Sequence, residues 1–249
     1  MEILTLEALR DNYIYILIDT FHKTAVVVDP SESAPVLEAL HKRNLSLTAI
    51  LNTHHHHDHV GGNNILLEMF PSAKVFGGKN EGRIPSQHVF LAENDCFTVC
   101  ESQCRILDIP GHTRGHIAYY FEKEGWLFSG DTIFGGTCGA IFEGTPEQMF
   151  ESLKKIAQLP PNTSIWCSHE YTEMFMPEAA KLDAHNSKIL ERTHRVKQLR
   201  NTGTPTVPLL LQEELDTNPF LRFSNPEFAS QYNSNPGLDT FLKVIQASG

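Results

Sequence analysis

The chain has 249 residues, a formal net charge of −10 and the composition of an ordinary globular protein. This length accommodates one large domain or two modest ones around a real core. The acidic balance argues against nucleic acid as a partner, because phosphate binding needs a basic face. No apolar run approaches the length of a membrane span, and the N-terminus lacks the basic segment of a signal peptide.

Five cysteines occur at positions 96, 100, 104, 138 and 167, and no two of them form a Cys-x-x-Cys pair. An odd number without such a pair favours reduced thiols over a disulfide framework. The sequence therefore predicts a cytoplasmic protein.

The first two-thirds of the chain alternates short strands with turns and a few helices. Strands with helices outside them favour a layered α/β sandwich. Hydrophobic periodicity and turn residues predict strands at 14–18, 25–28, 47–51, 74–76, 89–91, 97–99, 105–109, 117–121, 126–128 and 164–167, with helices at 35–43, 63–70 and 146–158.

The character of the chain changes after residue 170. Residues 173–182 and 186–200 have helical periodicity with charged outer faces, and Thr202-Gly203-Thr204-Pro205 ends the second helix. We therefore expect one domain over 1–170 and a small, mainly helical C-terminal domain over 171–249.

The run of residues 53–59, Thr-His-His-His-His-Asp-His, is the most informative part of the sequence. Within it, four residues fit a His-x-His-x-Asp-His pattern, namely His54, His56, Asp58 and His59. Imidazole nitrogen and carboxylate oxygen suit zinc, iron or manganese, and four ligands so close together can serve two ions. An affinity tag or a solvated histidine loop is the alternative. The run is internal, however, and directly follows the apolar segment 47–51.

Three further candidate ligands each follow a predicted strand and stand beside small residues: His112, Asp131 and His169. A lone histidine after a strand is usually structural, but three such positions together are harder to dismiss. Loops at one edge of a sandwich can converge on a site held by the strands beneath. Five histidines and two aspartates would fill two metal sites that share a bridging carboxylate and a bridging water.

With these residues in place, the sequence resembles the metallo-β-lactamase superfamily and, within it, the hydroxyacylglutathione hydrolases (glyoxalase II). The resemblance implies a four-layer αββα sandwich as the catalytic domain over 1–170, and a small helical C-terminal domain over 171–249 that binds substrate. It rests on motifs that span almost the whole chain: Asp11-Asn12-Tyr13, the histidine run, Pro110-Gly111-His112-Thr113, Gly130-Asp131-Thr132, Cys138-Gly139, Glu143-Gly144-Thr145, His169-Glu170-Tyr171-Thr172 and Asn218-Pro219-Phe220-Leu221-Arg222.

The resemblance also implies the roles of individual residues. His54, His56 and His112 match the ligands of a first metal, Asp58, His59 and His169 those of a second, and Asp131 the bridging ligand. Two divalent ions are expected, zinc first, with iron or manganese as alternatives. Asp58 and Asp131 would also orient the attacking hydroxide. The expected substrate contacts are Tyr120, Ala140, Ile141, Phe142, Tyr171 and Lys243.

Two divalent ions on one bridging water lower its pKa to near 7, so that hydroxide is available at neutral pH. A thioester suits this chemistry because its leaving thiolate is weakly basic, with a thiol pKa of about 8.5. The substrate that the resemblance implies is S-(2-hydroxyacyl)glutathione, above all S-D-lactoylglutathione. Hydrolysis to glutathione and D-lactate is the second step of methylglyoxal detoxification. The expected partner is this small molecule alone, with no nucleic acid or membrane, and the expected state is a monomer.

The sequence departs from the family pattern where glutathione is expected to bind. Ala140 stands where a basic residue commonly follows Cys-Gly, Phe142 replaces a frequent tyrosine, and Gln246 follows Lys243 where a second basic residue is common. These changes predict weaker glutathione binding or a shifted thiol preference.

Other readings stay open at this point. A persulfide dioxygenase of the same fold uses one iron on a two-histidine, one-carboxylate face, which would leave the second ligand set unexplained. Another hydrolase of the fold, acting on a different ester or thioester, is a further alternative. His116 is expected to support the site rather than bind metal, and His55 and His57 occupy variable positions of the motif.

Overall fold

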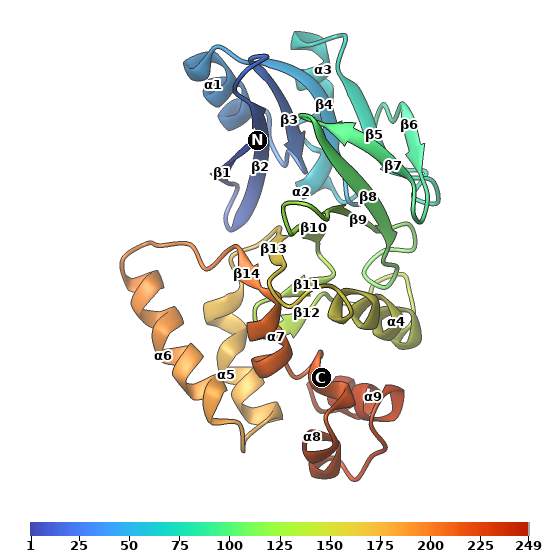
Figure 1. Ribbon diagram of the computed structural model, residues 1–249, viewed down its shortest axis with the longest axis vertical. Coiled ribbons are helices and arrows are strands. Elements are labelled where there is room, and N and C mark those ends of the chain that lie inside the picture. The colour runs from blue at the N-terminus through green and yellow to red at the C-terminus, as the bar shows by residue number, and fades with distance from the viewer. Residues whose placement is uncertain (249) are drawn as a thin grey trace. The chain divides into compact units, whose positions relative to one another are not determined.

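The computed structural model describes residues 1–248. These residues form two compact units (Figure 1). The first unit comprises Met1–Asp108 and Thr113–Gly130, and the second comprises Ile109–His112 together with the described chain from Asp131 onward.

A six-stranded sheet in the order β1-β2-β3-β4-β5-β6 forms the centre of the first unit. β1, β2 and β3 pair antiparallel, whereas β3, β4, β5 and β6 pair parallel. The predicted strands in β2 to β6 are confirmed, but β1 was not predicted. In chain order the six strands span Glu2–Ala8, Asn12–Asp19, Thr24–Val28, Ser46–Leu51, Lys74–Gly78 and Val89–Leu91.

Strand β2 is buried on both faces, which explains its continuous apolar sequence. Ile14 and Ile16 pack in one core cluster with Val36 and Leu40 of α1 (Ala34–Arg43). Tyr15 points the other way, and its ring centroid lies 5.5 Å from that of Phe128. Helices therefore cover one face of the sheet, and a second layer of strands covers the other.

That second layer consists of β7, β8, β9 and β10, which pair antiparallel within the first unit. Phe97 of β7 stacks on Phe76 of β5, with 4.9 Å between ring centroids. Leu66 of α3 (Asn63–Met69) joins the core on the opposite face of the first sheet. The strands span Cys96–Val99, Ser102–Asp108, Ile117–Phe121 and Trp126–Gly130, close to their predicted positions.

The second unit is mainly helical (Figure 1). Its two small antiparallel strand pairs are β11 with β12 and β13 with β14. They span Ile133–Phe134, Thr137–Cys138, Ser164–Cys167 and Leu209–Leu210. The helices are α4 (Pro146–Ala157), α5 (Thr172–Leu182), α6 (Ser187–Asn201), α7 (Leu211–Thr217), α8 (Pro226–Gln231) and α9 (Leu238–Ala247), with a 3-10 turn η1 at Arg222–Ser224.

The sequence predicted the start of α4 and the positions of α5 and α6 correctly. Thr145 caps α4 by accepting a hydrogen bond from the backbone N–H of Gln148, whose side chain in turn accepts one from the N–H of Thr145. Met176 and Ala179 of α5 pack against Ile189 and Val196 of α6. The apolar residues of α5 and α6 thus lie on the faces that pack together, as the helical periodicity of the sequence indicated.

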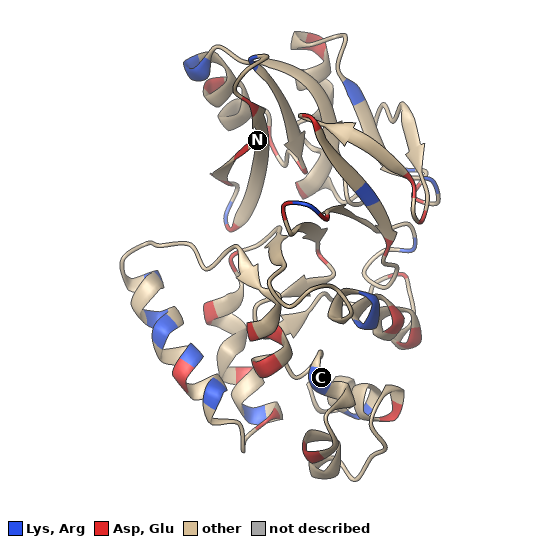
Figure 2. Cartoon of the chain, viewed as in Figure 1, with Lys and Arg blue, Asp and Glu red and all other residues tan. Residues whose placement is uncertain are grey.

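Helix α6 contains several basic residues (Figure 2), of which Lys188, Arg195 and Lys197 are exposed, but Arg192 is only 2% exposed. Its guanidinium pairs with the buried Glu214 of α7 and donates a 2.7 Å hydrogen bond to Thr217 Oγ1. Glu214 Oε2 accepts 3.0 Å hydrogen bonds from Gly136 N and Asn218 Nδ2. A buried polar network thus joins α6, α7 and the β11–β12 turn.

Sheets with helices and a helical C-terminal region give the chain the predicted α+β class. The division into compact units differs from the predicted domain boundary between residues 170 and 171. That boundary stays a prediction. No disulfide joins any of the cysteines in the described part of the chain. Across residues 1–248, no helix has both the length and the apolar character that crossing a bilayer requires.

Candidate metal centre

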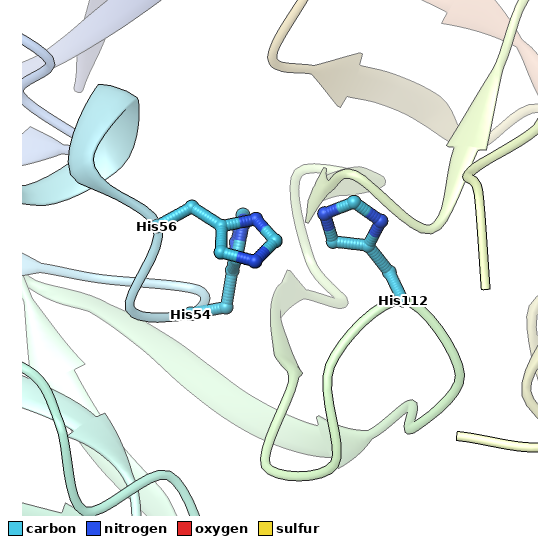
Figure 3. A group of neighbouring side chains, drawn as sticks. All are labelled: His54, His56 and His112. Atoms are coloured by element: carbon cyan, nitrogen blue, oxygen red, sulfur yellow. The ribbon is translucent and has the colours of Figure 1, made fainter. Parts of the chain in front are cut away.

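The histidine run begins in the loop after β4 and continues into the short helix α2 (His57–Val60) of the first unit. His54 is fully buried, and His56 is partly buried. Both side chains project from the same loop (Figure 3), and His54 Nε2 lies 3.0 Å from His56 Nδ1. Thr53 Oγ1 lies 3.0 Å from His54 Nδ1, so the other ring nitrogen of His54 is the one that faces His56.

Asp58 and His59 follow on the short helix α2. His59 Nε2 lies 3.7 Å from Asp58 Oδ2. Asn12 Nδ2 donates to the backbone oxygen of Asp58 at 3.1 Å and to its Oδ2 at 3.2 Å. The Asp11-Asn12-Tyr13 motif therefore orients Asp58 through Asn12.

Asp29 orients His59, a role that sequence reasoning missed. Its buried carboxylate accepts hydrogen bonds from Thr53 N at 2.8 Å and Thr53 Oγ1 at 2.6 Å, and its Oδ2 lies 3.0 Å from His59 Nδ1. This contact leaves His59 Nε2 to face Asp58. The available signal was a carboxylate directly after a strand, the placement that also marked Asp131.

Asp29, His54 and His59 also place one ligand atom each within 4.8 Å of one another. Both carboxylate oxygens of Asp29 are already engaged by Thr53 and His59. We therefore assign Asp29 to orientation and not to metal binding.

The second unit holds the other three predicted ligands. His112 follows β8 in a turn (Figure 3), Asp131 follows β10, and His169 follows β13. Asp131 Oδ2 lies 3.4 Å from His112 Nε2 and 3.5 Å from His169 Nε2. His112 Nδ1 donates a 2.7 Å hydrogen bond to Ala140 O, and because a carbonyl can only accept, its Nε2 remains available as a ligand atom.

The spacing of these atoms fits tetrahedral metal coordination. Two ligand atoms, each about 2.0–2.1 Å from a zinc ion, lie about 3.3 Å apart in a tetrahedral site. The His54–His56, His112–Asp131, His169–Asp131 and Asp58–His59 ligand atoms are 3.0, 3.4, 3.5 and 3.7 Å apart. Within each unit, the predicted ligands therefore already have the separations that a bound ion needs.

Gly139 lies against Asp131. A Cβ atom at this position would be 1.8 Å from the backbone oxygen of Asp131, and Gly139 N donates to Thr132 O at 3.1 Å. No side chain fits there without displacing the main chain that carries the Asp131 carboxylate. The Cys138-Gly139 motif therefore serves the geometry of the ligand.

Three of the predicted substrate contacts lie in the turn that accepts the His112 hydrogen bond. Ala140 is exposed and Ile141 is partly exposed. Phe142 is 69% exposed, and its ring centroid lies 5.1 Å from that of His112. A cavity of about 360 Å³ beside this turn is lined by Ala140, Ile141, Phe175, Glu178 and Phe220, among others. These positions are accessible to a small molecule.

Tyr171 is placed by stacking on His169, with 4.7 Å between centroids and 10° between ring planes. Lys243 of α9 donates to the backbone oxygens of Tyr232 and Asn233 at 3.1 and 2.7 Å. Tyr120 is only 1% exposed and lies in β9 with the Arg105 guanidinium 5.4 Å from its ring centroid. The burial of Tyr120 does not favour a direct contact with substrate.

Four other histidines have partners outside the predicted ligand pairs. His116 stacks on His54, with 4.7 Å between ring centroids, which agrees with its expected supporting role. His55 Nδ1 lies 2.5 Å from Glu81 Oε1. His22 pairs with Asp19, and His88 accepts a hydrogen bond from Val75 N.

Comparisons with known proteins show which proteins this chain is similar to. A model of the hydroxyacylglutathione hydrolase C-terminus matches residues 170–247, and a model of the metallo-beta-lactamase superfamily matches residues 11–87. The hydroxyacylglutathione hydrolase of Trichormus variabilis is 48% identical over 250 residues, which cover 98% of this chain and 97% of that protein. The hydroxyacylglutathione hydrolase of Rippkaea orientalis is 52% identical over 231 residues, 90% of each chain.

Among solved structures, TTHA1623 in a di-iron-bound form superimposes with a TM-score of 0.61 at 26% identity. The match covers 89% of this chain and 100% of that one. The predicted metallo-β-lactamase fold is thereby confirmed.

Proposed function

Because the chain belongs to the hydroxyacylglutathione hydrolase family, we propose that it hydrolyses S-(2-hydroxyacyl)glutathione, above all S-D-lactoylglutathione, to glutathione and a 2-hydroxy acid. The proposal places this reaction second in methylglyoxal detoxification. We further propose that the protein is a cytoplasmic monomer. Its partner would be the small thioester, and it would bind neither nucleic acid nor a membrane.

The observation that carries the proposal is the pairing of predicted ligands. We assign His54, His56 and His112 to one metal ion, Asp58, His59 and His169 to the other, and Asp131 to both. The support is that Asp131 Oδ2 lies beside His112 Nε2 and also beside His169 Nε2, one predicted ligand of each ion. Zinc is the first expectation, and iron or manganese would suit the same donor atoms.

Two bound divalent ions would supply activated water at neutral pH and polarise the thioester carbonyl. The protein's part is to fix the donor atoms before substrate arrives. Asn12 holds the Asp58 carboxylate, Asp29 holds His59, and the Ala140 carbonyl holds His112. The carboxylates of Asp58 and Asp131 would in addition accept hydrogen bonds from the attacking water and orient it.

Phe142 and Tyr171 border this site within the second unit. The exposed Phe142 ring beside His112 and the Tyr171 ring stacked on His169 would flank a substrate at the ligands. The thiolate product needs little help to depart, because a thiol has a pKa of about 8.5. The site therefore suits a thioester, because none of the residues assigned to it has to protonate the leaving group.

A persulfide dioxygenase is the runner-up from another reaction class. That enzyme uses one iron on a two-histidine, one-carboxylate face, which would leave Asp58, His59 and His169 without a role. Another hydrolase of the fold, with a different ester or thioester substrate, is the second alternative. The identity of 48% to 52% with hydroxyacylglutathione hydrolases over nearly the whole chain favours the glutathione thioester.

A metal analysis beside a substrate panel tests the proposal. The purified protein should bind close to two metal ions per chain and release glutathione from S-D-lactoylglutathione. The panel varies the acyl and the thiol part separately and includes glutathione persulfide with an oxygen electrode. Oxygen uptake with one iron per chain, in place of thioester cleavage, would contradict the proposal and favour the dioxygenase.

The loss of a basic residue at Ala140 predicts a raised Michaelis constant for glutathione thioesters. None of the described residues that line the adjacent cavity is a lysine or arginine, and Lys243 is engaged by two backbone carbonyls. Ala140→Arg should therefore lower KM by about two- to fivefold with little change in kcat, the range of an exposed ion pair. Steady-state kinetics with S-D-lactoylglutathione measures both constants. Ala140→Gln is the matched uncharged control, and an equal effect of both variants would refute the role of charge.

A further inference from the structure

Glu81 is a buried carboxylate to which the proposed reaction assigns no role. It lies in the turn after β5, and its side chain is 0% exposed. A carboxylate is costly to bury unless other groups pair with it. The groups that meet Glu81 therefore show what its burial achieves.

Three side chains of the first unit contact the Glu81 carboxylate. Oε1 lies 2.5 Å from His55 Nδ1 and accepts a 3.1 Å hydrogen bond from Arg83. Oε2 accepts a 2.8 Å hydrogen bond from the hydroxyl of Thr113. Arg83 is half exposed, whereas Thr113 is fully buried and His55 is only 15% exposed. The two sheltered partners of the carboxylate are thus His55 and Thr113.

Both sheltered partners stand next to predicted metal ligands. His55 lies between His54 and His56, and Thr113 directly follows His112. One carboxylate therefore links two loops that are far apart in the sequence. These loops supply the three ligands assigned to one metal ion.

Close backbone packing fixes Glu81 in this position. A Cβ atom on Gly115 would lie 2.4 Å from both N and Cα of Glu81. A Cβ atom on Gly78 would lie 2.3 Å from the backbone oxygen of Gly115. The turn that carries Glu81 and the loop that follows Thr113 are therefore in direct main-chain contact. Neither Gly78 nor Gly115 therefore has room for a side chain.

We propose that Glu81 is a positioning residue for metal binding: it holds His55 and Thr113, and through them the loops that carry His54, His56 and His112. The inference rests on the metal centre of the proposed function. Both oxygens of Glu81 are engaged by its neighbours, so Glu81 itself is not a ligand. Its effect is to fix the ligand loops before metal binds.

Metal affinity of the folded protein tests this role. We expect Glu81→Ala to weaken zinc binding about 10- to 100-fold, the usual effect of losing a group that orients a ligand. Competition with a chromophoric chelator gives the dissociation constants for zinc. The measurement is made at a temperature well below the melting temperature, so that the protein stays folded. The absorption spectrum of the cobalt(II)-substituted protein should change as well, because ligand geometry sets it. Glu81→Gln keeps one acceptor oxygen, so its affinity should lie between wild type and Glu81→Ala.

Glu124 provides a matched control. Its carboxylate accepts a hydrogen bond from Ser102, and it lies in the turn before β10, at the opposite end of that strand from Asp131. Glu124→Ala should leave zinc affinity and the cobalt spectrum unchanged. Thr113→Val in the Glu81→Ala background should add little, because both changes remove the same hydrogen bond.

The outcomes separate the two proposals. If Glu81→Ala only lowers the melting temperature while affinity and spectrum match wild type, Glu81 is merely structural and the inference is overturned. If Glu81→Ala does not fold, the same comparison with Glu81→Gln decides. A wild-type protein that binds no metal would overturn the proposed function, and the inference with it. Metal-loaded wild type beside an unaffected variant overturns the inference alone.

Discussion

Asp131→Ala should abolish nearly all thioester hydrolysis. The substitution removes the oxygen that lies 3.4 Å from His112 Nε2 and 3.5 Å from His169 Nε2, and so the only ligand assigned to both ions. Metal polarisation of a carbonyl is worth several kcal/mol, and each 1.36 kcal/mol is tenfold in rate. We therefore expect kcat/KM to fall by at least about 10³-fold, with metal content falling from two ions toward one or none.

The control for Asp131 is Asp19, another aspartate at the end of a strand. Asp19 lies at the end of β2 opposite Asn12, and its partner is the exposed His22. Asp19→Asn should retain both metals and full turnover. Circular dichroism of the metal-free proteins checks that Asp131→Ala is folded. Turnover within threefold of wild type in folded Asp131→Ala would rule out a bridging role.

Arg192→Met should lower the free energy of unfolding by about 3–5 kcal/mol, since breaking a buried ion pair leaves an uncompensated charge. Arg192 is 2% exposed, and its partner Glu214 is fully buried. For a chain of this size the loss corresponds to a melting temperature roughly 6–20 °C lower. Calorimetry and urea denaturation of the metal-free protein measure both quantities.

Arg195 on the same helix is the matched control for Arg192. It pairs with Glu213 but is 52% exposed, so Arg195→Met should cost less than about 1 kcal/mol. The double variant Arg192→Met/Glu214→Leu removes both charges and should recover part of the stability. Equal losses in Arg192→Met and Arg195→Met would show that burial of the pair has no energetic weight.

The candidate ligands could be proposed from the sequence because their pattern is local. His54, His56, Asp58 and His59 lie within one loop and the helix after it, and the other ligands follow apolar strands. Strand β2 was equally clear, since burial on both faces gives an uninterrupted apolar run. Helices α5 and α6 were found from their period, because packing on one face sets it.

The residues that orient the ligands were not predictable in the same way. Asp29 and Glu81 contact residues that are about 30 positions away in the sequence. The residues next to Asp29 and Glu81 give no sign of which residues these are. Strand β1 was missed because it is a partly exposed edge strand, in which polar and apolar residues mix. The burial of Tyr120 depends on long-range packing, which motif resemblance does not describe.

The contact between Gly139 and the Asp131 main chain limits which positions can be mutated to alter this protein's substrate range. A Cβ atom 1.8 Å from that oxygen would make every variant at position 139 a defective catalyst, whatever its effect on recognition. Directed-evolution libraries should therefore keep codon 139 invariant and diversify positions 140 and 142, where the exposed side chains of Ala140 and Phe142 leave space for new groups.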